Sequence, residues 1–364
     1  MTLLLVLILA ADPPAVTIGA ELGSPRQPQI ALANNGVVHL VFGDGTRVYY
    51  TRSTGVAPLR FDRPVKVADV PNLPLGMRRG PRVAEVGETI VVTAIGGPKG
   101  KGRDGDLFAW RSTDAGMTWR GPARVNDVGA AAREGLHAMA AGSEGTFACA
   151  WLDLRTKRTK LQVSTSKDGA TWTPNALAYE SPTGSICECC HPSLVFENGG
   201  TLHLFWRNSI DGFRDMYRSV SMDGGKSFSA AIKLGSGSWK LNACPMDGGS
   251  IAVHGGKAMT AWRREHIVYA TFGNDQTEVR LGDGEQPAIA RLGAGALVVW
   301  VKRRPGDLLI QRDTDSMPTR IGGDAADPVA ASADDGRHAV VAWEGKSSGR
   351  QVILVQSIGE RRDQ

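Results

Sequence analysis

Short apolar runs, separated by turns rich in Gly, Asp and Pro, recur along the whole chain and form one repeating pattern. Each repeat opens with a strand near Pro, His or Gly, continues through a Gly-containing turn into a second apolar strand, and adds a third and a fourth strand. The openings lie at 27–30, 80–83, 136–139, 191–194, 247–250, 286–289 and 327–330. Their spacing of roughly 40 to 55 residues is typical of β-propeller blades.

The second strands of these repeats support the same register, because most of them end an apolar run with an aromatic residue. These aromatic residues are Phe42, Trp151, Trp206, Trp262, Trp300 and Trp343. Only the second repeat departs from the pattern, with the aliphatic run 92–95 in this place. We expect the aromatic side chains to fill the space between adjacent blades, where large apolar groups bury the most surface.

The seventh repeat, 327–358, offers only three strands before the chain ends. Residues 14–19 resemble the fourth strands of other repeats, such as 231–234. This segment can close the ring and so remove an open sheet edge that would invite aggregation. We therefore predict one all-β domain over residues 12–364: a seven-bladed β-propeller closed by an N-terminal strand, with a six-bladed propeller as the alternative. We expect a monomer.

Composition agrees with short strands joined by tight turns, because the 364 residues include 45 Gly and 9 Trp. The formal net charge of +5 is modest for this length, and the Lys and Arg residues are scattered over apparent loops. A solvated surface accounts for such a distribution, whereas a nucleic-acid interface needs a clustered basic patch. We therefore expect no nucleic-acid partner.

The N-terminus carries an apolar run at 3–11 that ends in Ala10 and Ala11, directly before Asp12. Small residues at this point fit cleavage by a signal peptidase, so we interpret residues 1–11 as a signal peptide for export to the periplasm or the outside. A mis-started terminus is the alternative, because no basic segment precedes the run. The run is too short to span a bilayer and no other segment approaches that length, so we predict no membrane span. Export would place the cysteines where disulfides are permitted.

Three turns share a Ser-x-Asp pattern followed by Gly and an aromatic residue, at 112–119, 166–172 and 221–228. The Asp can accept turn N–H groups and the Gly can supply a positive φ, which suits a hairpin between the third and fourth strands. The turns resemble the Asp-box, or bacterial neuraminidase repeat, of sialidase-like propellers. That resemblance implies a structural role for them, away from the site face.

A second resemblance covers essentially the whole chain. A subgroup of exported bacterial sialidase-like proteins pairs a Cys-acidic-Cys-Cys fragment with a Trp-x-x-x-x-Cys-Pro fragment. Here these fragments read Cys187-Glu188-Cys189-Cys190 and Trp239 followed by Cys244-Pro245. The chain is therefore similar to bacterial exo-α-sialidase-like propellers with Asp-boxes, a family whose name rests on fold.

Sialidase activity would need arginines for a sugar carboxylate and a Tyr activated by Glu. The resemblance places Arg26 and Arg79 before the first two openings as anion-site candidates, and Tyr269 with Glu265 as the nucleophile candidates. The sialidase Phe/Tyr-Arg-Ile-Pro motif is incomplete, because Arg26-Gln27-Pro28 lacks the aromatic residue and Ile. An exo-α-sialidase-type glycoside hydrolase is thus one alternative, and solvated arginines at strand ends are the other interpretation.

Four soft or borderline donors lie within five positions: Cys187, Cys189, Cys190 and His191. Cys244 and Met246 precede the next opening. Because consecutive blades are neighbours, residues just before successive first strands should meet at one rim of the central channel. We therefore predict a cysteine, histidine and methionine cluster at this rim, which binds a small molecule, a glycan or a soft metal ion.

The cluster permits three chemical interpretations. In an oxidising compartment the four cysteines can form two disulfides that only staple two blades, with a pairing that sequence does not reveal. Thiolate, thioether and imidazole donors instead suit Cu(I), or Zn in a tetrahedral site. Cys187 to His191 also matches the haem c attachment pattern, with Met246 as the distal ligand, but haem c is disfavoured because it needs a large apolar pocket. Cys149, inside an apolar strand, is expected to be a buried, inert thiol.

Overall fold

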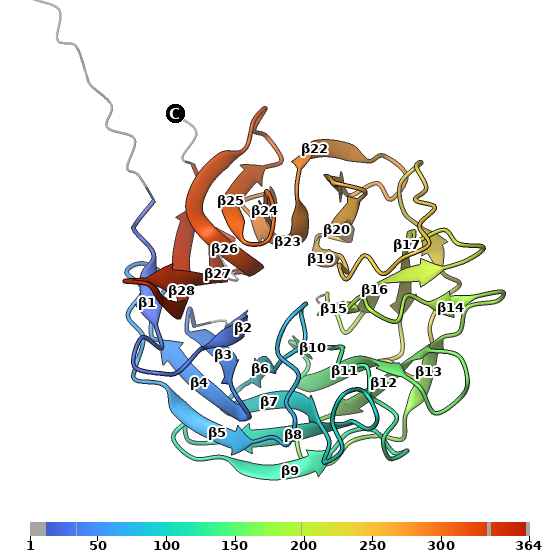
Figure 1. The fold of residues 1–364 in the computed structure, drawn as a ribbon, viewed down its shortest axis with the longest axis horizontal. Helices are drawn as coiled ribbons and strands as arrows, with labels where there is room; N and C mark the ends of the chain where they lie inside the picture. The colour runs from blue at the N-terminus through green and yellow to red at the C-terminus, as the bar shows by residue number, and fades with distance from the viewer. Residues whose placement is uncertain (1–11, 34, 198, 333–335, 362–364) are drawn as a thin grey trace, which may run out of the picture.

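The structure, a computed structural model, describes residues 12–361 except 34, 198 and 333–335. These residues form 28 strands and contain no helix, so the all-β prediction is confirmed. Figure 1 shows the strands arranged as sheets in a ring. The predicted signal peptide, residues 1–11, lies outside the described residues. Within them, no helix is long and apolar enough to cross a membrane.

Five of the sheets each contain one repeat, with consecutive strands antiparallel. The first sheet contains β2 (Arg26–Leu32), β3 (Val38–Asp44), β4 (Arg47–Ser53) and β5 (Val65–Asp69). The second contains β6 (Arg82–Val86), β7 (Thr89–Gly96), β8 (Asp106–Ser112) and β9 (Arg120–Arg124). The third contains β10 (His137–Gly142), β11 (Thr146–Asp153), β12 (Lys160–Ser166) and β13 (Ala176–Tyr179).

The fourth sheet has a short additional strand before its first channel strand. It contains β14 (Ser185–Ile186), β15 (Ser193–Phe196), β16 (Leu202–Ser209), β17 (Met216–Ser221) and β18 (Ile232–Lys233). The fifth contains β19 (Ser250–His254), β20 (Lys257–Arg264), β21 (Ile267–Phe272) and β22 (Val279–Asp283). In Figure 1, β2, β6, β10, β15, β19 and β23 lie nearest the centre of the ring.

The last sheet has seven strands because one long strand is shared by two repeats. It contains β1 (Val16–Ile18), β23 (Glu285–Leu292), β24 (Gly295–Val301), β25 (Gly306–Arg312), β26 (Thr319–Ser332), β27 (His338–Ser347) and β28 (Arg350–Gly359). Residues 319–325 of β26 pair with β25, and residues 326–332 pair with β27. β26 is therefore the fourth strand of one repeat and the first strand of the next.

The N-terminal segment pairs with the C-terminal strand. Val16 of β1 lies opposite Val355 of β28, and Ile18 lies opposite Ile353, in an antiparallel register. Figure 1 shows β1 beside β28. The sequence prediction of a closing N-terminal strand is confirmed, and β28 is covered by a partner.

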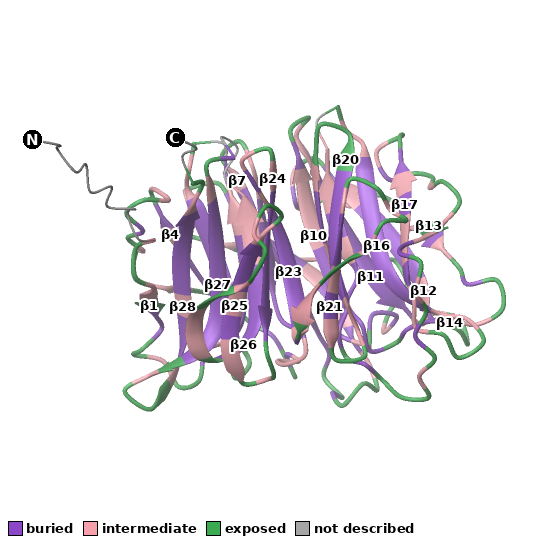
Figure 2. Ribbon diagram, turned by 90° about the horizontal axis from the view of Figure 1, so that it is seen from above, coloured by how far each residue is buried: buried purple, intermediate pink, exposed green. Residues whose placement is uncertain are grey.

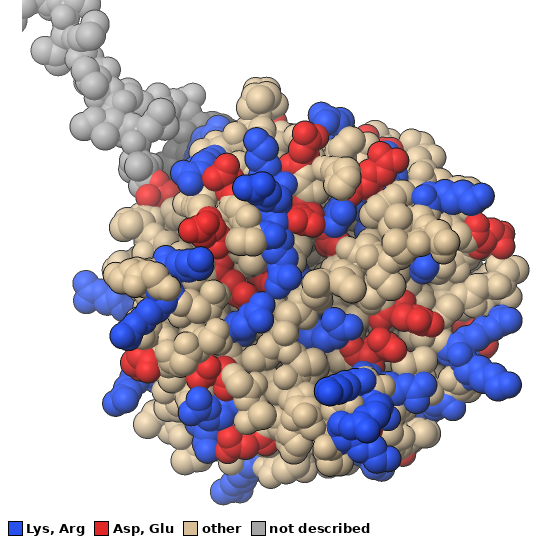
Figure 3. Space-filling model, in the orientation of Figure 1, with Lys and Arg blue, Asp and Glu red and all other residues tan. Residues whose placement is uncertain are grey.

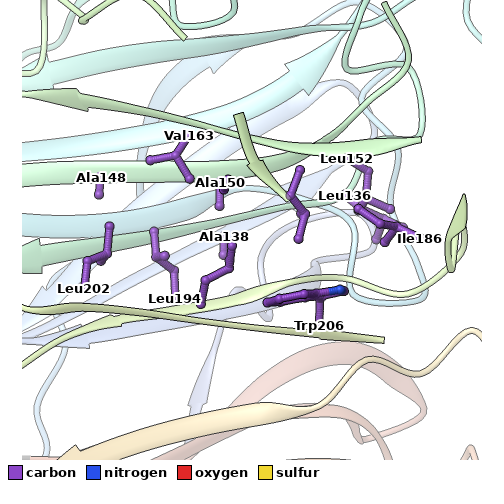
Figure 4. Packing of buried hydrophobic residues seen from close by; sticks show 13 residues of the cluster. Leu136, Ala138, Ala148, Ala150, Leu152, Val163, Ile186, Leu194, Leu202 and Trp206 are labelled. Atoms are coloured by element: carbon purple, nitrogen blue, oxygen red, sulfur yellow. The ribbon is translucent and has the colours of Figure 1, made fainter. Parts of the chain in front are cut away.

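The core consists of apolar layers between neighbouring sheets, where purple strands stand face to face in Figure 2. Trp151, Trp206, Trp300 and Trp343 are among the largest fully buried side chains, as their positions predicted. Figure 4 shows one such layer, in which Trp206 lies with Leu136, Leu152 and Ile186. Each layer buries large side chains from two sheets, so neighbouring repeats stabilise one another through apolar burial.

The Asp-box turns join third to fourth strands, as predicted, and are held by hydrogen bonds to their own Asp and Ser. In the turn between β8 and β9, the Gly116 N–H donates to the Ser112 hydroxyl (2.9 Å) and the Thr118 N–H donates to Asp114 (2.9 Å). The turns after β12 and β17 repeat this pattern. Because the strands are antiparallel, these turns lie at the opposite end of the sheets from the first-strand openings. We call the two ends the Asp-box face and the cysteine face, the latter being the end with residues 78–81, 133–136, 187–191 and 245–249.

Candidate functional site

A tight turn on the cysteine face gathers three thiols. β14 pairs with β16, the Cys187 N–H donates to the Arg207 carbonyl (3.0 Å), and the Cys190 N–H closes the turn on the Cys187 carbonyl (3.2 Å). The Cys187 sulfur lies 3.3 Å from that of Cys190 and 3.7 Å from that of Cys189. All three side chains are buried, and their sulfur atoms lie within 4.8 Å of one another. The structure therefore brings these three predicted ligands together.

The second fragment reaches this turn as the sequence predicted, but through Cys189 and not Cys190. Both Met246 and Cys244 lie close enough to affect the Cys189 thiol: the Met246 backbone lowers the pKa of Cys189, and Cys189 raises the pKa of Cys244. Gly248 permits the close approach, because a Cβ there would lie 2.2 Å from the His191 carbonyl oxygen. Cys244 is exposed and the Met246 side chain is 40% exposed, so they form the solvent side of the cluster.

All five cysteines are free thiols in the structure. The sulfur separations of 3.3 and 3.7 Å exceed a disulfide bond of about 2.05 Å and correspond to hydrogen-bonded thiols. Cys149 is buried in β11, where desolvation raises the pKa of its thiol. The expectation that Cys149 is a buried thiol is therefore confirmed.

The pKa values of the three clustered thiols are shifted in different directions. Hydrogen bonding with Cys189 and Cys190 lowers the pKa of Cys187 well below its usual value, and Arg207 adds to the effect. Burial raises the pKa of Cys190, whereas the hydrogen bond to Cys187 raises that of Cys189. The turn thus favours a thiolate at Cys187 within a group of three hydrogen-bonded sulfur atoms, and a soft cation can replace the remaining thiol protons.

His191 lies outside this group of sulfur atoms. Its ring lines the central channel with Arg78 and Arg82, and burial lowers its pKa. His137, which opens the preceding blade, shares a hydrogen bond with Thr93 of β7 (3.0 Å). Among the described residues, the compact donor set therefore consists of sulfur atoms alone.

Arg207 connects the thiol turn to the channel mouth. Its guanidinium is buried and donates to the backbone carbonyls of Asp247 (3.0 Å), Arg214 (2.6 Å) and Arg263 (2.7 Å). Trp239 covers it, with the ring centroid 5.3 Å from the Arg207 guanidinium and 5.7 Å from that of Arg263. The Trp-x-x-x-x-Cys-Pro fragment thus contributes two side chains here: Cys244 lies beside the thiol turn, and Trp239 makes a cation–π contact with Arg207.

Carboxylate and amide side chains link successive blades at the mouth, which sequence reasoning missed. Asp247 accepts the Gln286 N–H (2.7 Å), and the Gln286 amide exchanges hydrogen bonds with Asp327, each of 2.8 Å. Glu344 accepts from both the N–H and the side-chain amide of Gln27 (2.8 Å each). Burial raises the pKa of Asp247 and Glu344. The sequence signal for these links was the recurring Gln-Pro or Asp-Pro dipeptide at the repeat openings. Gln27, Gln286 and Asp327 of these dipeptides have positive φ.

The sialidase candidates do not form one cluster. The Arg26 guanidinium pairs with Glu344 (3.3 Å), and Arg79 donates to the Glu134 carbonyl (2.8 Å). Tyr269 is stacked with Trp262 and lies under the Arg264 guanidinium, 3.9 Å from the ring centroid.

Glu265, the proposed activator of Tyr269, lies in the exposed turn between β20 and β21. No hydrogen bond between its carboxylate and the Tyr269 hydroxyl occurs in the described part of the chain. The four candidates therefore remain predictions, distributed over three sheets.

A cavity of about 960 Å³ opens on the cysteine face beside the channel mouth. Its walls mix both signs of charge, from Arg263, Glu285, Lys302, Arg320 and Asp324 among others. Figure 3 shows both signs of charge interspersed over one face of the molecule. The cavity is large enough for a small ligand.

Solved structures with similar folds cover almost all of this chain. A protein of unknown function from Dyadobacter fermentans has 16% identity and a TM-score of 0.58, over 96% of this chain and 99% of that one. The GH93 α-L-arabinofuranosidase of Fusarium graminearum, in complex with arabinobiose, has 10% identity and a TM-score of 0.58, over 96% and 98%. Trypanosoma rangeli sialidase has 10% identity and a TM-score of 0.51, over 95% and 60%. These low identities show a shared propeller fold.

The family comparison covers more than half of the sequence. No curated protein matches the chain significantly. The model of the BNR repeat-like domain matches residues 75–279, which include the three Asp-box turns and the thiol cluster. The chain therefore belongs to the BNR repeat-like family of sialidase-like propellers.

Proposed function

We propose that this propeller binds a soft metal ion, Cu(I), at the thiol cluster of Cys187, Cys189 and Cys190. The observation that carries the proposal is the convergence of three buried sulfur atoms, all within 4.8 Å, in one turn. Burying three adjacent thiols gives little apolar benefit that Ala or Val would not give, whereas thiolates are the ligands that Cu(I) selects.

The surroundings support copper over zinc. Zinc in a structural site takes four N or S ligands in a closed tetrahedron. Here three sulfurs are buried, while the fourth cysteine, Cys244, is exposed, and no imidazole joins the sulfur group. A site with three thiolates, and with Cys244 and Met246 at its solvent side, suits a low-coordinate soft ion that can enter and leave. Zinc is the alternative outcome of the metal test.

The proposal also includes the number of blades and the export of the protein from the cytoplasm. We propose seven blades, which is supported by a channel cavity lined from β2, β6, β10, β15, β19, β23 and β26. Residues 1–11 would direct export, and N-terminal sequencing of protein from the periplasmic fraction tests this. A mature chain that begins near residue 12 is the expected result.

The test of metal binding is an anaerobic Cu(I) titration against a chromophoric chelator. We expect one equivalent to bind the wild-type chain and the affinity to fall by about 100-fold or more in a Cys187→Ser/Cys190→Ser variant, because two ligands are lost. Cys149→Ser is the matched control, since Cys149 lies in a different sheet and should leave the titration unchanged. Equal Cu(I) affinity in the wild type and the double variant would refute the proposal. Selective binding of Zn and not Cu(I) would show that zinc is the metal of this site.

A glycan site is a second candidate function, favoured by the charged cavity of about 960 Å³ next to the channel mouth. Propellers of this fold include an arabinofuranosidase that binds arabinobiose and a sialidase. Hydrolysis assays with a fluorogenic sialoside and with an arabino-oligosaccharide test it. Activity that is lost in Arg26→Ala would support an anion subsite at Arg26, and activity that survives this change would remove Arg26 from the site.

A further inference from the structure

Two guanidinium groups are buried in the central channel without a carboxylate partner. Arg78 is 6% exposed and Arg82 is 7% exposed. Arg78 donates to the carbonyl of Gln286 (2.7 Å) across the channel, and Arg82 donates to the carbonyls of Pro81 (3.0 Å) and Arg78 (2.5 Å). Among the described residues, neither arginine has a carboxylate oxygen within salt-bridge distance. Among the described residues, the hydrogen-bond partners of both guanidinium groups are backbone carbonyls.

The acidic residues at the mouth already have other partners. Asp327 pairs with Arg304 (2.7 Å), Glu344 pairs with Arg26 (3.3 Å), and Asp247 accepts the Gln286 N–H. The negative charges of these three carboxylates act on the pKa of Arg78 from a distance, but none of the carboxylates contacts its guanidinium. Burial, together with the neighbouring charge of Arg78, nonetheless lowers the pKa of Arg82 to about 9. The immediate surroundings of Arg82 are thus short of negative charge.

A cavity of about 170 Å³ lies in the channel beside these groups. Arg78, Arg82 and His191 line it, together with backbone from the innermost strands. One buried nitrogen atom of these lining residues, Nε of Arg78, has no hydrogen-bond partner among the described residues. An unsatisfied buried donor is costly, so the cavity offers unused hydrogen-bonding capacity next to unpaired positive charge.

We propose that this channel cavity is a binding site for a small inorganic anion, a halide or a small oxyanion, held by Arg78 and Arg82. An anion there would pair with the two guanidinium groups and accept a hydrogen bond from Nε of Arg78. It would also tie the second repeat to the sixth, because Arg78 spans the channel to Gln286. The proposal is independent of the thiol cluster, whose sulfur atoms are not part of this cavity.

Bromide is the probe, because its anomalous scattering identifies it at a defined position. We expect crystals of the full chain soaked in sodium bromide to show an anomalous peak between Arg78, Arg82 and His191. In solution, bromide should raise the melting temperature by about 2 °C or more relative to gluconate at equal ionic strength, since gluconate is too large to enter the channel.

Variants separate this site from general salt effects and from the metal site. Arg82→Gln should lose both the peak and the bromide-dependent shift, whereas Arg133→Gln, an exposed arginine on the same face, should keep both. Cys187→Ser/Cys190→Ser should also keep both. Wild-type crystals with no bromide in the channel, or an equal bromide shift in a folded Arg82→Gln protein, would overturn the proposal. The wild-type crystals decide the question even if Arg82→Gln does not fold.

Discussion

Individual cysteines in this chain differ in chemistry because they differ in depth and neighbours. Cys244 is exposed, the three turn cysteines are buried against one another, and Cys149 is buried in an apolar strand. Thiol reactivity follows thiolate content and access together. Burial therefore protects the Cys187 thiolate although hydrogen bonds lower its pKa.

We predict an order of alkylation by iodoacetamide in the metal-free native protein. Cys244 should react first because it is exposed, and Cys149 should react only after unfolding because burial blocks access and raises its pKa. Peptide mass spectrometry over time measures the order. Addition of Cu(I) should protect Cys187, Cys189 and Cys190 without changing Cys149. Modification of native Cys149 at the rate of Cys244 would contradict the described burial.

The single ring of Trp239 covers two guanidinium groups, those of Arg207 and Arg263. We predict that Trp239→Ala lowers the free energy of unfolding by about 3 kcal/mol, from lost burial and lost cation–π contact. Trp239→Phe is the matched control and should retain most of the stability, since it keeps an aromatic face. Urea denaturation measures both variants. A loss as large in the Phe variant as in the Ala variant would rule out the role of the ring face.

At the scale of elements, each Asp-box hairpin depends on an ionised carboxylate. Hydrogen bonds from Thr118 lower the pKa of Asp114 to about 2, and backbone N–H groups of Thr171 and Ala170 lower that of Asp168 to about 2. The Ser227 hydroxyl lowers the pKa of Asp223 in the same way. An unfolded chain would titrate near pH 3.9.

This difference predicts a pH dependence with a defined sign. Because the folded pKa values are depressed, the hairpins contribute stability above about pH 4 and lose it as the pH falls through about 2. The variant Asp114→Asn/Asp168→Asn/Asp223→Asn cannot titrate at these positions. Its free energy of unfolding should therefore fall less between pH 4 and pH 2 than that of the wild type. Parallel curves for the two proteins, measured by urea denaturation at each pH, would show that the Asp-box carboxylates do not carry this dependence.

For the whole molecule, stability depends on closing the ring. Ile18 of β1 is buried against apolar residues of the sheets that contain β2 and β28, whereas Thr17 of the same strand is exposed. We predict that Ile18→Ala lowers the free energy of unfolding by about 2 to 4 kcal/mol and raises aggregation, because β28 loses its cover. Thr17→Ala should change stability by no more than about 0.5 kcal/mol. Equal behaviour of the two variants in denaturation and light scattering would argue against closure by β1.

The fold and part of the site could be predicted from sequence because both depend on local patterns. Apolar alternation, the Trp positions and the Asp-box turns each act within one repeat, and consecutive repeats must be neighbours. Cys189 and Cys244 therefore meet as expected. The aromatic side chains of the second strands also lie between neighbouring sheets, as the Trp206 side chain does in Figure 4.

The positions of Gln27, Gln286 and Asp327 at the channel mouth could not be predicted, because they depend on loop paths and register shifts. One residue of slip moves a side chain to the other face of a strand. Such shifts occur at the Pro-containing openings of β2, β23 and β26. His191 was assigned to the sulfur cluster on sequence proximity, yet its ring lies in the channel, since the chain turns into β15 there.

X-ray absorption at the copper edge of the Cu(I)-loaded protein tests the central claim most directly. Copper binding at the thiol cluster predicts a first shell of sulfur atoms at about 2.3 Å, near the length of other metal–thiolate bonds, in the wild type and in Cys149→Ser. It also predicts that Cys187→Ser/Cys190→Ser loses these sulfur scatterers. A first shell of nitrogen and oxygen in the wild type, or a sulfur shell that survives in the double variant, would contradict it.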